Sequence, residues 1–375
     1  MDISPSDRLL DVAHTVRTPA LLYDLKELDR CIARLRAVFS PLSRWELSYA
    51  AKANLSDDVL RALWRSGIAS IDVASVQELR TVEAAGFRRF RATGPSFREL
   101  DFPRLAASDI LFNIGSLTQL EQWGRFAPGT SIGLRIRTPL SHANPYRSLY
   151  GSTSRFGVGL GDPALRQVLD RHGLKIKALH MHNGSVTPRD LVEKVDLALT
   201  WASLVPTVSE INVGGGLYGL LLDTNDTEHA IAHLKSKIEL FDHDRETPVT
   251  LVAEPGAALV GPIGYFVTEV LDVEERELGK DHLRTITVDI SPWNLAPWMR
   301  PIIVNLTLPD AQLAPGRVTG PTLYEEDAFV GPEGQILKVP HCRVGDRLLM
   351  AGAGAYTMTN LRSLHELPPP HQYAI

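Results

Sequence analysis

The sequence contains little cysteine, no long apolar run and no excess of basic residues. Its two cysteines, Cys31 and Cys342, lie far apart and form no Cys-x-x-Cys pair, which excludes a disulfide framework and a zinc knuckle. The N-terminal stretch carries charges where a secretory segment would be apolar, and no run of about 18 apolar residues occurs. Lys and Arg total 39 against 44 Asp and Glu, a net charge of −5, which argues against a nucleic-acid partner. We therefore expect a cytoplasmic protein that binds neither nucleic acid nor a membrane.

The composition is that of an ordinary globular protein. Apolar residues make up 44% of the 375 positions and charged residues 22%, close to the averages for folded domains. A chain of this length can bury a sizeable core, either as one large domain or as two unequal ones. The histidines are scattered along the sequence, so no metal site is expected.

Short β-rich runs alternate with helix-like segments over most of the chain. In the helix-like segments, such as 56–66, 76–85, 117–126 and 188–204, apolar residues recur at spacings of three and four. Such alternation indicates βαβ units and a parallel sheet, and eight units over about 210 residues suit a (β/α)8 barrel. The eight expected strands are Glu46–Asn54, Ile68–Ser75, Arg89–Ser96, Asp109–Ser116, Ser131–Thr138, Lys175–Ser185, Glu210–Gly216 and Thr250–Gly256.

The C-terminal third has a different pattern. Proline-punctuated β runs follow one another there with little helical periodicity. We expect a barrel over residues 31–270 and a mostly antiparallel β domain over 271–375, joined by an N-terminal segment, 1–30, that contains a β run at 19–24. The tail, 367–375, is expected to be an extended arm at a surface or a dimer contact.

Active-site groups of a barrel come from the C-terminal ends of its strands. The polar residues at these ends are Lys52, Asp72, Ser75, His180, His182, the run Gly214-Gly215-Gly216, and Glu254. A lysine near the end of an apolar strand is costly to bury as a cation. Lys52 is therefore either a lysine that extends its amine to water at the rim, or a desolvated amine able to form a Schiff base.

Three other features favour the Schiff base. The glycine run can present backbone N–H groups to a phosphate, although such a run is as often a plain turn. Glu254 lies in an apolar run and needs a partner, which a protonated heterocyclic nitrogen would provide. His182 could lie flat against such a ring, although an inward histidine is more often a core residue. Together these groups are the parts of a pyridoxal-phosphate site.

The chain resembles the alanine-racemase-like, fold-type III pyridoxal-phosphate enzymes, and more closely their decarboxylase branch of diaminopimelate, ornithine and arginine decarboxylases. The resemblance covers nearly the whole length, and its motifs follow the order in which the family has them. They are TPALLYD (18–24), YAAKAN (49–54), DVASVQEL (72–79), SRFGVGL (154–160), HMHNGS (180–185), VGGGL (213–217), AEPG (253–256), GPTLYEED (320–327) and VGDRLLMAGAGAYT (344–357).

The resemblance implies a role for each matching residue. Lys52 would hold pyridoxal 5′-phosphate as an internal aldimine, His182 would stack on the ring, and Glu254 would pair with the ring nitrogen. The phosphate-binding residues would be Ser185, Gly214, Gly215, Gly216 and Tyr356. The family forms head-to-tail homodimers with shared sites, so the loop 320–327 would face Lys52 of a partner subunit.

Three positions depart from the family pattern. Leu323 replaces the cysteine that protonates Cα in the family, and an alkyl chain cannot donate a proton. Tyr324 replaces the acidic residue that reads the substrate's distal amine, and Ala257 replaces an arginine that contacts phosphate or carboxylate. Arg300 in WMRP resembles a substrate-carboxylate contact, although a surface arginine would look the same. His142 loosely matches a further family position.

These departures leave several functions open. The first is decarboxylation of an amino acid or amino-acid-like intermediate of specialised metabolism, in which Tyr324, Lys52 or water protonates Cα. Tyr324, Tyr356 and Arg300 would then contact the substrate, and an aromatic wall of Trp293, Trp298 and Tyr324 would suit a bulky or apolar one. The second is other Cα chemistry, either racemisation or decarboxylation-coupled transamination. The third is a non-catalytic protein that binds the cofactor.

Overall fold

The computed structural model describes residues 5–107, 110–138, 140, 154–278, 281–330, 334 and 336–375. The chain divides into two compact units, which are treated separately below. The barrel unit comprises Ile32–Lys52 and Leu63–Ala258. The β unit comprises Met1–Cys31, Ala53–Ala62 and Leu259–Ile375. The first residues of the chain thus belong to the β unit, which resumes at 259 rather than at the expected 271, because its longest strand already begins at Gly264. No helix among the described residues is long and apolar enough to cross a membrane.

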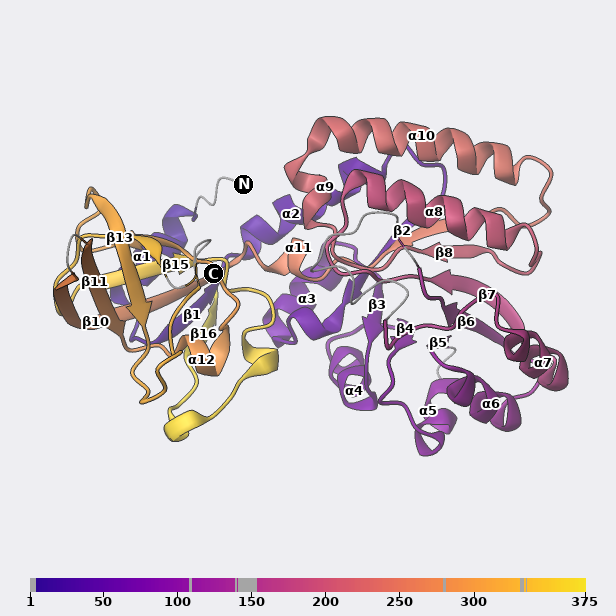
Figure 1. Ribbon diagram of the computed structural model, residues 1–375, viewed down its shortest axis with the longest axis horizontal. Helices are drawn as coiled ribbons and strands as arrows, with labels where there is room; N and C mark the ends of the chain where they lie inside the picture. Colours follow the sequence, from indigo (N-terminus) through magenta and orange to yellow (C-terminus); the bar gives the residue numbers. More distant parts are fainter. Residues whose placement is uncertain are drawn as a thin grey trace. The chain divides into compact units, whose positions relative to one another are not determined.

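Eight parallel strands close into a barrel, which confirms the predicted (β/α)8 architecture (Figure 1). Each expected β run overlaps one of them, and only β2 begins outside its run, by one residue at Trp45. The strands are β2 (Trp45–Ala50), β3 (Ser70–Val73), β4 (Arg89–Thr93), β5 (Leu111–Ile114), β6 (Ser131–Arg135), β7 (Lys175–His180), β8 (Glu210–Asn212) and β9 (Thr250–Ala253). The ladder closes where β9 pairs with β2.

Helices cover the outside of the barrel (Figure 1). Those that belong to the barrel unit alone are α4 (Val76–Ala84), α5 (Phe102–Ala107), α6 (Leu117–Phe126), α7 (Pro163–His172), α8 (Pro188–Ala202), α9 (Tyr218–Leu222) and α10 (Thr224–Asp242). Three further helices contain residues of both units: α2 (Leu25–Phe39), α3 (Asp57–Arg65) and α11 (Ala257–Val260). Local signals set their starts: Ser75 and Ser116 cap α4 and α6, and Thr187 forms a capping box with Asp190 at α8. Aromatic packing joins α5 and α6 to β5, where the rings of Phe102 and Trp123 lie 5.1 Å apart.

The β unit is a mixed sheet with strand order β12-β15-β10-β11-β13-β14, and β1 pairs with both β10 and β16. Its elements are α1 (Asp7–Thr15), β1 (Ala20–Tyr23), β10 (Gly264–Leu278), β11 (Asp281–Val288), α12 (Pro292–Leu295), β12 (Ile302–Asn305), β13 (Leu313–Thr319), β14 (Leu337–Pro340), β15 (Arg347–Ala351) and β16 (His371–Ala374). The N-terminal strand joins this sheet, as predicted.

Two details of the β unit differ from the expectation. The pairs β11–β13 and β1–β16 are parallel, so the sheet is mixed rather than mostly antiparallel. The tail is not a free arm, because β16 is a strand in the sheet beside β1, where Tyr23 donates its hydroxyl to Gln372 Oε1 at 2.9 Å. The two ends of the chain therefore stabilise one another through backbone pairing.

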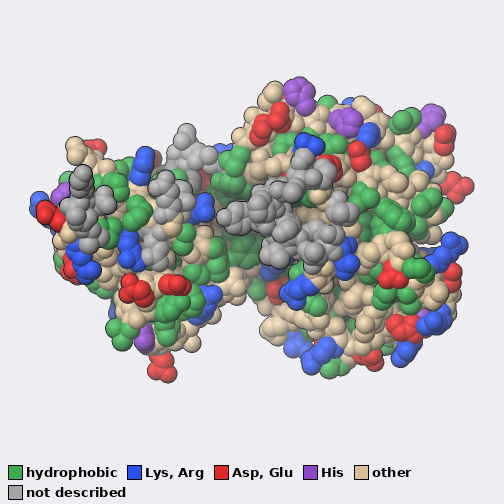
Figure 2. All heavy atoms as spheres, in the orientation of Figure 1, with side chains coloured by type: hydrophobic (Ala, Val, Ile, Leu, Met, Phe, Trp, Pro, Cys, Tyr) green, Lys and Arg blue, Asp and Glu red, His purple; other side chains and the backbone are tan. Residues whose placement is uncertain are grey.

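Charges of both signs are interspersed on the molecular face seen in Figure 2. Lys and Arg side chains lie among Asp and Glu there, and no large area of a single sign stands out. This distribution is consistent with the small net charge of the sequence, −5.

Candidate active site

Polar side chains occupy the interior of the barrel at two-residue spacing. In a strand, residues i and i+2 point to the same face. The buried polar residues follow this rule on three strands, in the pairs Ser70 and Asp72, Arg91 and Thr93, and Glu210 and Asn212. A barrel interior is ordinarily filled by branched apolar side chains, so this polar interior marks the functional part of the unit.

Glu254 lies at the C-terminal end of β9 with 4% of its surface exposed. His180 Nε2 lies 3.0 Å from its Oε2, and Asn212 Nδ2 donates to its Oε1 at 2.6 Å. Burial alone would raise the pKa of Glu254, but the contacts with His180 and Asn212 and the charge of Lys52 outweigh burial and lower this pKa to about 2. Glu254 is therefore a buried, ionised carboxylate held in one orientation.

The imidazole of His180 supports that carboxylate. Burial lowers the pKa of His180, so the neutral ring donates from Nε2 to Glu254. Its Nδ1 has no hydrogen-bond partner among the described residues. The sequence marked His180 as a strand-end residue and gave it no role, and it did not single out Asn212 at all.

His182 lies beyond the end of β7 rather than on one strand face with His180. Its Nδ1 accepts the N–H of Gly215 at 3.2 Å, which places the ring proton on Nε2. Burial, followed by the nearby charge of Lys52, lowers the pKa of His182 well below its usual value. An uncharged ring fixed by this hydrogen bond is suited to lie against an aromatic ligand.

Lys52 sits on a 3-10 turn, Ala51–Ala53, that follows β2. Its side chain is exposed rather than desolvated within an apolar strand, which corrects that part of the expectation. The amine acts electrostatically on Glu254, His182 and Asp72. Lys52 is therefore an accessible amine at the strand ends that carry these three groups.

The pKa of Asp72 is shifted in the opposite direction to that of Glu254. Burial, and then the charge of Glu254, raise the pKa of Asp72 well above its usual value, although Lys52 acts in the opposite direction. Thr93 donates its hydroxyl to Asp72 Oδ1 at 2.7 Å. The environments of the two carboxyl groups therefore move their pKa values apart.

The glycine run is shaped first by backbone packing. Gly214 and Gly216 have φ values of +69° and +82°, and a Cβ on Gly216 would lie 1.6 Å from the carbonyl oxygen of Gly184. The N–H groups of Gly214 and Gly215 donate to Asn212 Oδ1 and His182 Nδ1. The N–H of Gly216 has no partner in the described part of the chain, and this group and the exposed Ser185 are the donors available to an anion.

Three predicted site residues belong to the β unit. Arg300 is exposed. Tyr356 has a left-handed backbone, with φ of 60°, and its N–H donates to the carbonyl of Ala53, the residue after Lys52, at 2.7 Å. Strain of this kind in a non-glycine residue is typical of functional sites. Tyr324 donates its hydroxyl to Glu326 Oε2 at 2.9 Å, and His142 lies outside the described residues.

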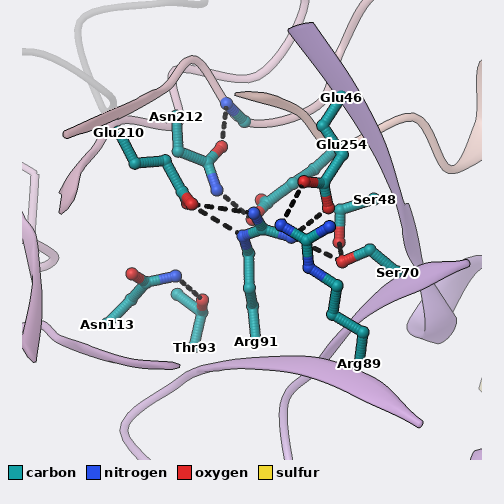
Figure 3. A network of polar contacts seen from close by, with 11 residues as sticks. Glu46, Ser48, Ser70, Arg89, Arg91, Thr93, Asn113, Glu210, Asn212 and Glu254 are labelled. Carbon is teal, nitrogen blue, oxygen red and sulfur yellow. Dashed lines mark hydrogen bonds and ion pairs between the residues drawn. The ribbon is translucent and has the colours of Figure 1, made fainter. Parts of the chain in front are cut away.

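Deeper in the barrel, Arg91 joins three strands (Figure 3). Its guanidinium donates to both carboxylate oxygens of Glu210 at 2.9 and 2.8 Å, to Glu46 at 2.8 Å and to Ser70. Arg89 on the same strand, whose side chain is largely exposed, forms an ion pair with Glu46 at 2.6 Å. This network holds β3, β4 and β8 together. Asp72, Thr93 and Asn212 are the next inward-facing residues on these three strands, so the network supports the base of the site.

We expect Arg91→Met to lower the free energy of unfolding by about 3–5 kcal/mol, because it leaves Glu46 and Glu210 without their buried partner. Arg89→Met is the matched control, since Arg89 is 63% exposed in side chain and such a pair contributes only about 0.2–1 kcal/mol. Urea unfolding of both variants measures the difference. Equal stability of the two variants would contradict the assignment.

The same variants should differ in their pH dependence. Burial opposes ionisation of Glu46, but its contacts with Arg91 and Arg89 lower its pKa overall. In the wild type, this stabilisation is present above the ordinary carboxyl pKa and is lost as the pH falls through the lowered value. Without Arg91, burial dominates, so lowering the pH from 7 to 5 should stabilise Arg91→Met relative to the wild type.

The barrel groups fit pyridoxal phosphate. An ionised carboxylate with a pKa of about 2 can keep a proton on a pyridine nitrogen, and His182 supplies a flat neutral ring. Lys52 supplies an accessible amine. Gly216 supplies a backbone N–H at a position where a Cβ would clash with the carbonyl oxygen of Gly184. The donor set therefore matches the amine, ring and phosphate contacts that this cofactor requires.

Comparison with known proteins gives the same result. The profile of the family described as "Pyridoxal-dependent decarboxylase, pyridoxal binding domain" matches residues 27–261, more than half of the chain. Diaminopimelate decarboxylase of Escherichia coli is 26% identical over 379 residues, covering 94% of this chain and 87% of that protein. The enzyme of the same name from Streptomyces coelicolor is 28% identical over 382 residues, covering 93% and 82%.

Solved structures share the fold. A crystal structure of diaminopimelate decarboxylase superposes with a TM-score of 0.84 at 24% identity, covering 100% of this chain and 94% of that one. Lysine/ornithine decarboxylase from Vibrio vulnificus, complexed with putrescine, gives a TM-score of 0.78 at 20% identity and covers 99% of both chains. With the profile match, these relatives show that the chain belongs to the pyridoxal-dependent decarboxylase family and is a pyridoxal 5′-phosphate-dependent amino-acid decarboxylase.

Proposed function

We propose that this decarboxylase acts, in a biosynthetic pathway, on an amino acid whose side chain is apolar or aromatic rather than terminated by an ammonium group. The observation that carries the proposal is the loop 320–327. Leu323 projects with 93% of its surface exposed, and the Tyr324 ring lies 4.5 Å from the Trp293 ring. Where the family places a thiol and a carboxylate, this chain presents apolar and aromatic surface.

The surroundings of Tyr324 support this choice. Glu326 accepts the Tyr324 hydroxyl, and the Arg362 guanidinium lies 4.4 Å from the centre of the Trp293 ring. A carboxylate that already accepts the hydroxyl of a phenol is poorly suited to bind a substrate ammonium group. Racemisation and cofactor binding without turnover, which the sequence left open, gain no support from the relatives named above, which are decarboxylases.

Each barrel residue has a proposed task in this reaction. Bound pyridoxal phosphate supplies an aldehyde that condenses with amines and a ring that withdraws electrons from Cα. The accessible amine of Lys52 would hold it covalently. Glu254 keeps the proton on the ring nitrogen, and His182 fixes the plane of the ring. Ser185 and the glycine run, chiefly through Gly216 N–H, bind the phosphate together with Tyr356.

Arg300 and Tyr324 complete the proposed site. Arg300 has an exposed guanidinium, which is suited to a substrate carboxylate. Tyr324 is the proposed proton donor to Cα, since its hydrogen bond to Glu326, with burial and the Glu326 charge, raises its pKa and keeps the hydroxyl protonated at neutral pH. A leucine at 323 leaves no acid there, so the neighbouring phenol takes the place of the thiol.

The proposed assembly is a head-to-tail homodimer in which the loop 320–327 completes the site of the partner. Exposed apolar side chains on the β unit support it: Leu323 is 93% exposed, Ile302 55% and Trp298 46%. Ile302 lies on β12, which ends the strand order of its sheet. An edge strand with exposed apolar side chains is unusual for a surface that stays in water, and a second copy of the chain would cover it.

A panel of amino acids tests the substrate class. The holoenzyme is incubated with phenylalanine, tyrosine, tryptophan and leucine, and in parallel with diaminopimelate, ornithine, lysine and arginine. Released CO2 is measured and the amine product is identified by mass spectrometry. We expect the apolar and aromatic set to be preferred by about tenfold or more in kcat/KM, the effect of one or two missing side-chain contacts. Preference for diaminopimelate would overturn the proposed class and leave the decarboxylase assignment intact.

A further inference from the structure

Lys194 is the only lysine among the buried residues of the described chain, with 0% of its surface exposed. It lies on α8, and its ammonium donates to the carbonyl oxygen of Val213, directly before the glycine run. Burial lowers the pKa of Lys194 to about 7, although Asp190 and Glu254 act to raise it. A methionine would fill this space at far lower cost of desolvation, so the amine needs a reason to be there.

The backbone of β8 and β9 supplies that reason. Thr250 N–H donates to Ser209 O, and Val213 N–H donates to Val252 O, both at 2.9 Å, as in a regular parallel ladder. Continued regularly, the ladder would take the N–H of Glu254 to Val213 O. Instead the N–H of Glu254 donates to Gly214 O at 2.9 Å. The register shifts by one residue, and the Val213 carbonyl leaves the ladder.

A buried carbonyl without a hydrogen-bond partner destabilises the folded state, and Lys194 supplies that partner to Val213. The one-residue shift that Lys194 permits turns the chain into the glycine run next to Glu254. Lys194 thus stabilises the distorted backbone that leads into the glycine run.

Lys194 also connects the two segments assigned to the phosphate. The first contains Ser185 and leads into α8 through Thr187 and Asp190. The second is the glycine run, and Val186 N–H donates to Gly216 O between the two at 2.8 Å. Lys194 lies on the helix that follows the first segment and bonds to the carbonyl that precedes the second.

We propose that Lys194 is a positioning residue for the cofactor phosphate, which holds the Val213 carbonyl out of the β8–β9 ladder and fixes the glycine run against the Ser185 segment. The proposal rests on the phosphate contacts assigned above. Lys194 does not touch the reacting atoms. Its effect should appear in the affinity for pyridoxal phosphate far more than in the affinity for pyridoxal, which lacks the phosphate.

The test uses full-length Lys194→Met and Lys194→Gln, with Lys237→Met as the matched control. Lys237 is on α10 and pairs with Asp196 of α8 at 2.7 Å. Lys237→Met therefore removes a lysine that contacts α8 and leaves the contacts of the glycine run unchanged. Dissociation constants for pyridoxal phosphate and pyridoxal are measured by fluorescence on reconstituted protein. Far-UV circular dichroism and thermal unfolding confirm that each variant is folded.

We expect Lys194→Met to weaken pyridoxal phosphate binding by about 10–100-fold and pyridoxal binding by less than about threefold, with partial recovery in Lys194→Gln, which retains a donor. Unchanged affinity for pyridoxal phosphate, or equal losses for both ligands, would overturn the proposal. If Lys194→Met does not fold, Lys194→Gln alone decides by the same comparison. Failure of the wild type to bind pyridoxal phosphate would instead contradict the proposed phosphate site.

Discussion

Replacing Lys52 by alanine abolishes decarboxylation and the covalent attachment of the cofactor. The amine of Lys52 lies at the strand ends beside Glu254, His182 and Asp72, and it is the amine proposed to form the covalent bond. We expect activity to fall by at least about 10⁴-fold, as when a catalytic nucleophile is removed. Borohydride reduction followed by intact-mass measurement should show a cofactor adduct in the wild type and none in Lys52→Ala.

Lys237→Ala serves as the control for loss of a lysine, because Lys237 pairs with Asp196 on the outer helices. It should retain both the adduct and the activity. An adduct of unchanged yield in Lys52→Ala would mean that another amine carries the cofactor, and the assignment of Lys52 would fail.

The same variant tests the shared sites of the proposed dimer. Asp327→Ala removes the buried carboxylate that accepts hydrogen bonds from Ser291, Trp293 and Thr322 and so organises the loop 320–327. In a dimer with shared sites, each mixed pair of Lys52→Ala and Asp327→Ala chains contains one intact site. Co-expression should then restore about one quarter of wild-type activity, on random pairing. If mixtures remain as inactive as the separate variants, the sites are not shared.

Replacing Glu254 by glutamine lowers kcat by about 10²–10³-fold, comparable to the removal of one electrostatic group from a preorganised site. Glutamine preserves the shape and can still contact Asn212 and His180, but it cannot hold a proton on the ring nitrogen. The measurement is kcat together with cofactor occupancy, because the variant should still bind the cofactor. Glu210→Gln is the matched control: this buried carboxylate pairs with Arg91, so its loss should reduce stability without a comparable loss of kcat.

The pH profile gives a second measurement of Glu254. A lowered pKa means that the ionised form contributes stability above the ordinary carboxyl value, and that this contribution is lost as the pH falls through about 2. The carboxylate therefore stays ionised across the working range of the enzyme. We expect no acid limb of kcat from Glu254 above about pH 4. An acid limb between pH 4 and 7 that disappears in Glu254→Gln would contradict this.

Much of the architecture could be predicted because it depends on local patterns. Spacings of three and four placed α6 at Leu117–Phe126, and each of the eight expected β runs overlaps a barrel strand. The predicted strands were too long at their C-terminal ends, as at β8, which stops at Asn212. The residues beyond each strand form the turns that carry the site, and their apolar or glycine-rich composition does not distinguish a turn from a strand.

The candidate site was predictable only in part. Lys52, His182, Glu254 and the glycine run were identified by residue type at strand ends. His180 and Asn212, which hold Glu254, were given no role, although polar residues at two-residue spacing in β8 were a signal that could have found Asn212. Lys194 could not be singled out, because a lysine on an amphipathic helix has the same sequence pattern whether it faces solvent or the barrel.

The sequence by itself determined the order of strands and helices and the residue types at the strand ends, because periodicity and turn chemistry act over a few neighbouring positions. Only the tertiary structure decided which groups meet: Arg91 with Glu210, Glu254 with His180, and β1 with β16. It also decided the one-residue shift between β8 and β9 that Lys194 accommodates. These pairings join residues far apart in the chain, so they depend on closure of the barrel and of the β sheet, which no local pattern encodes.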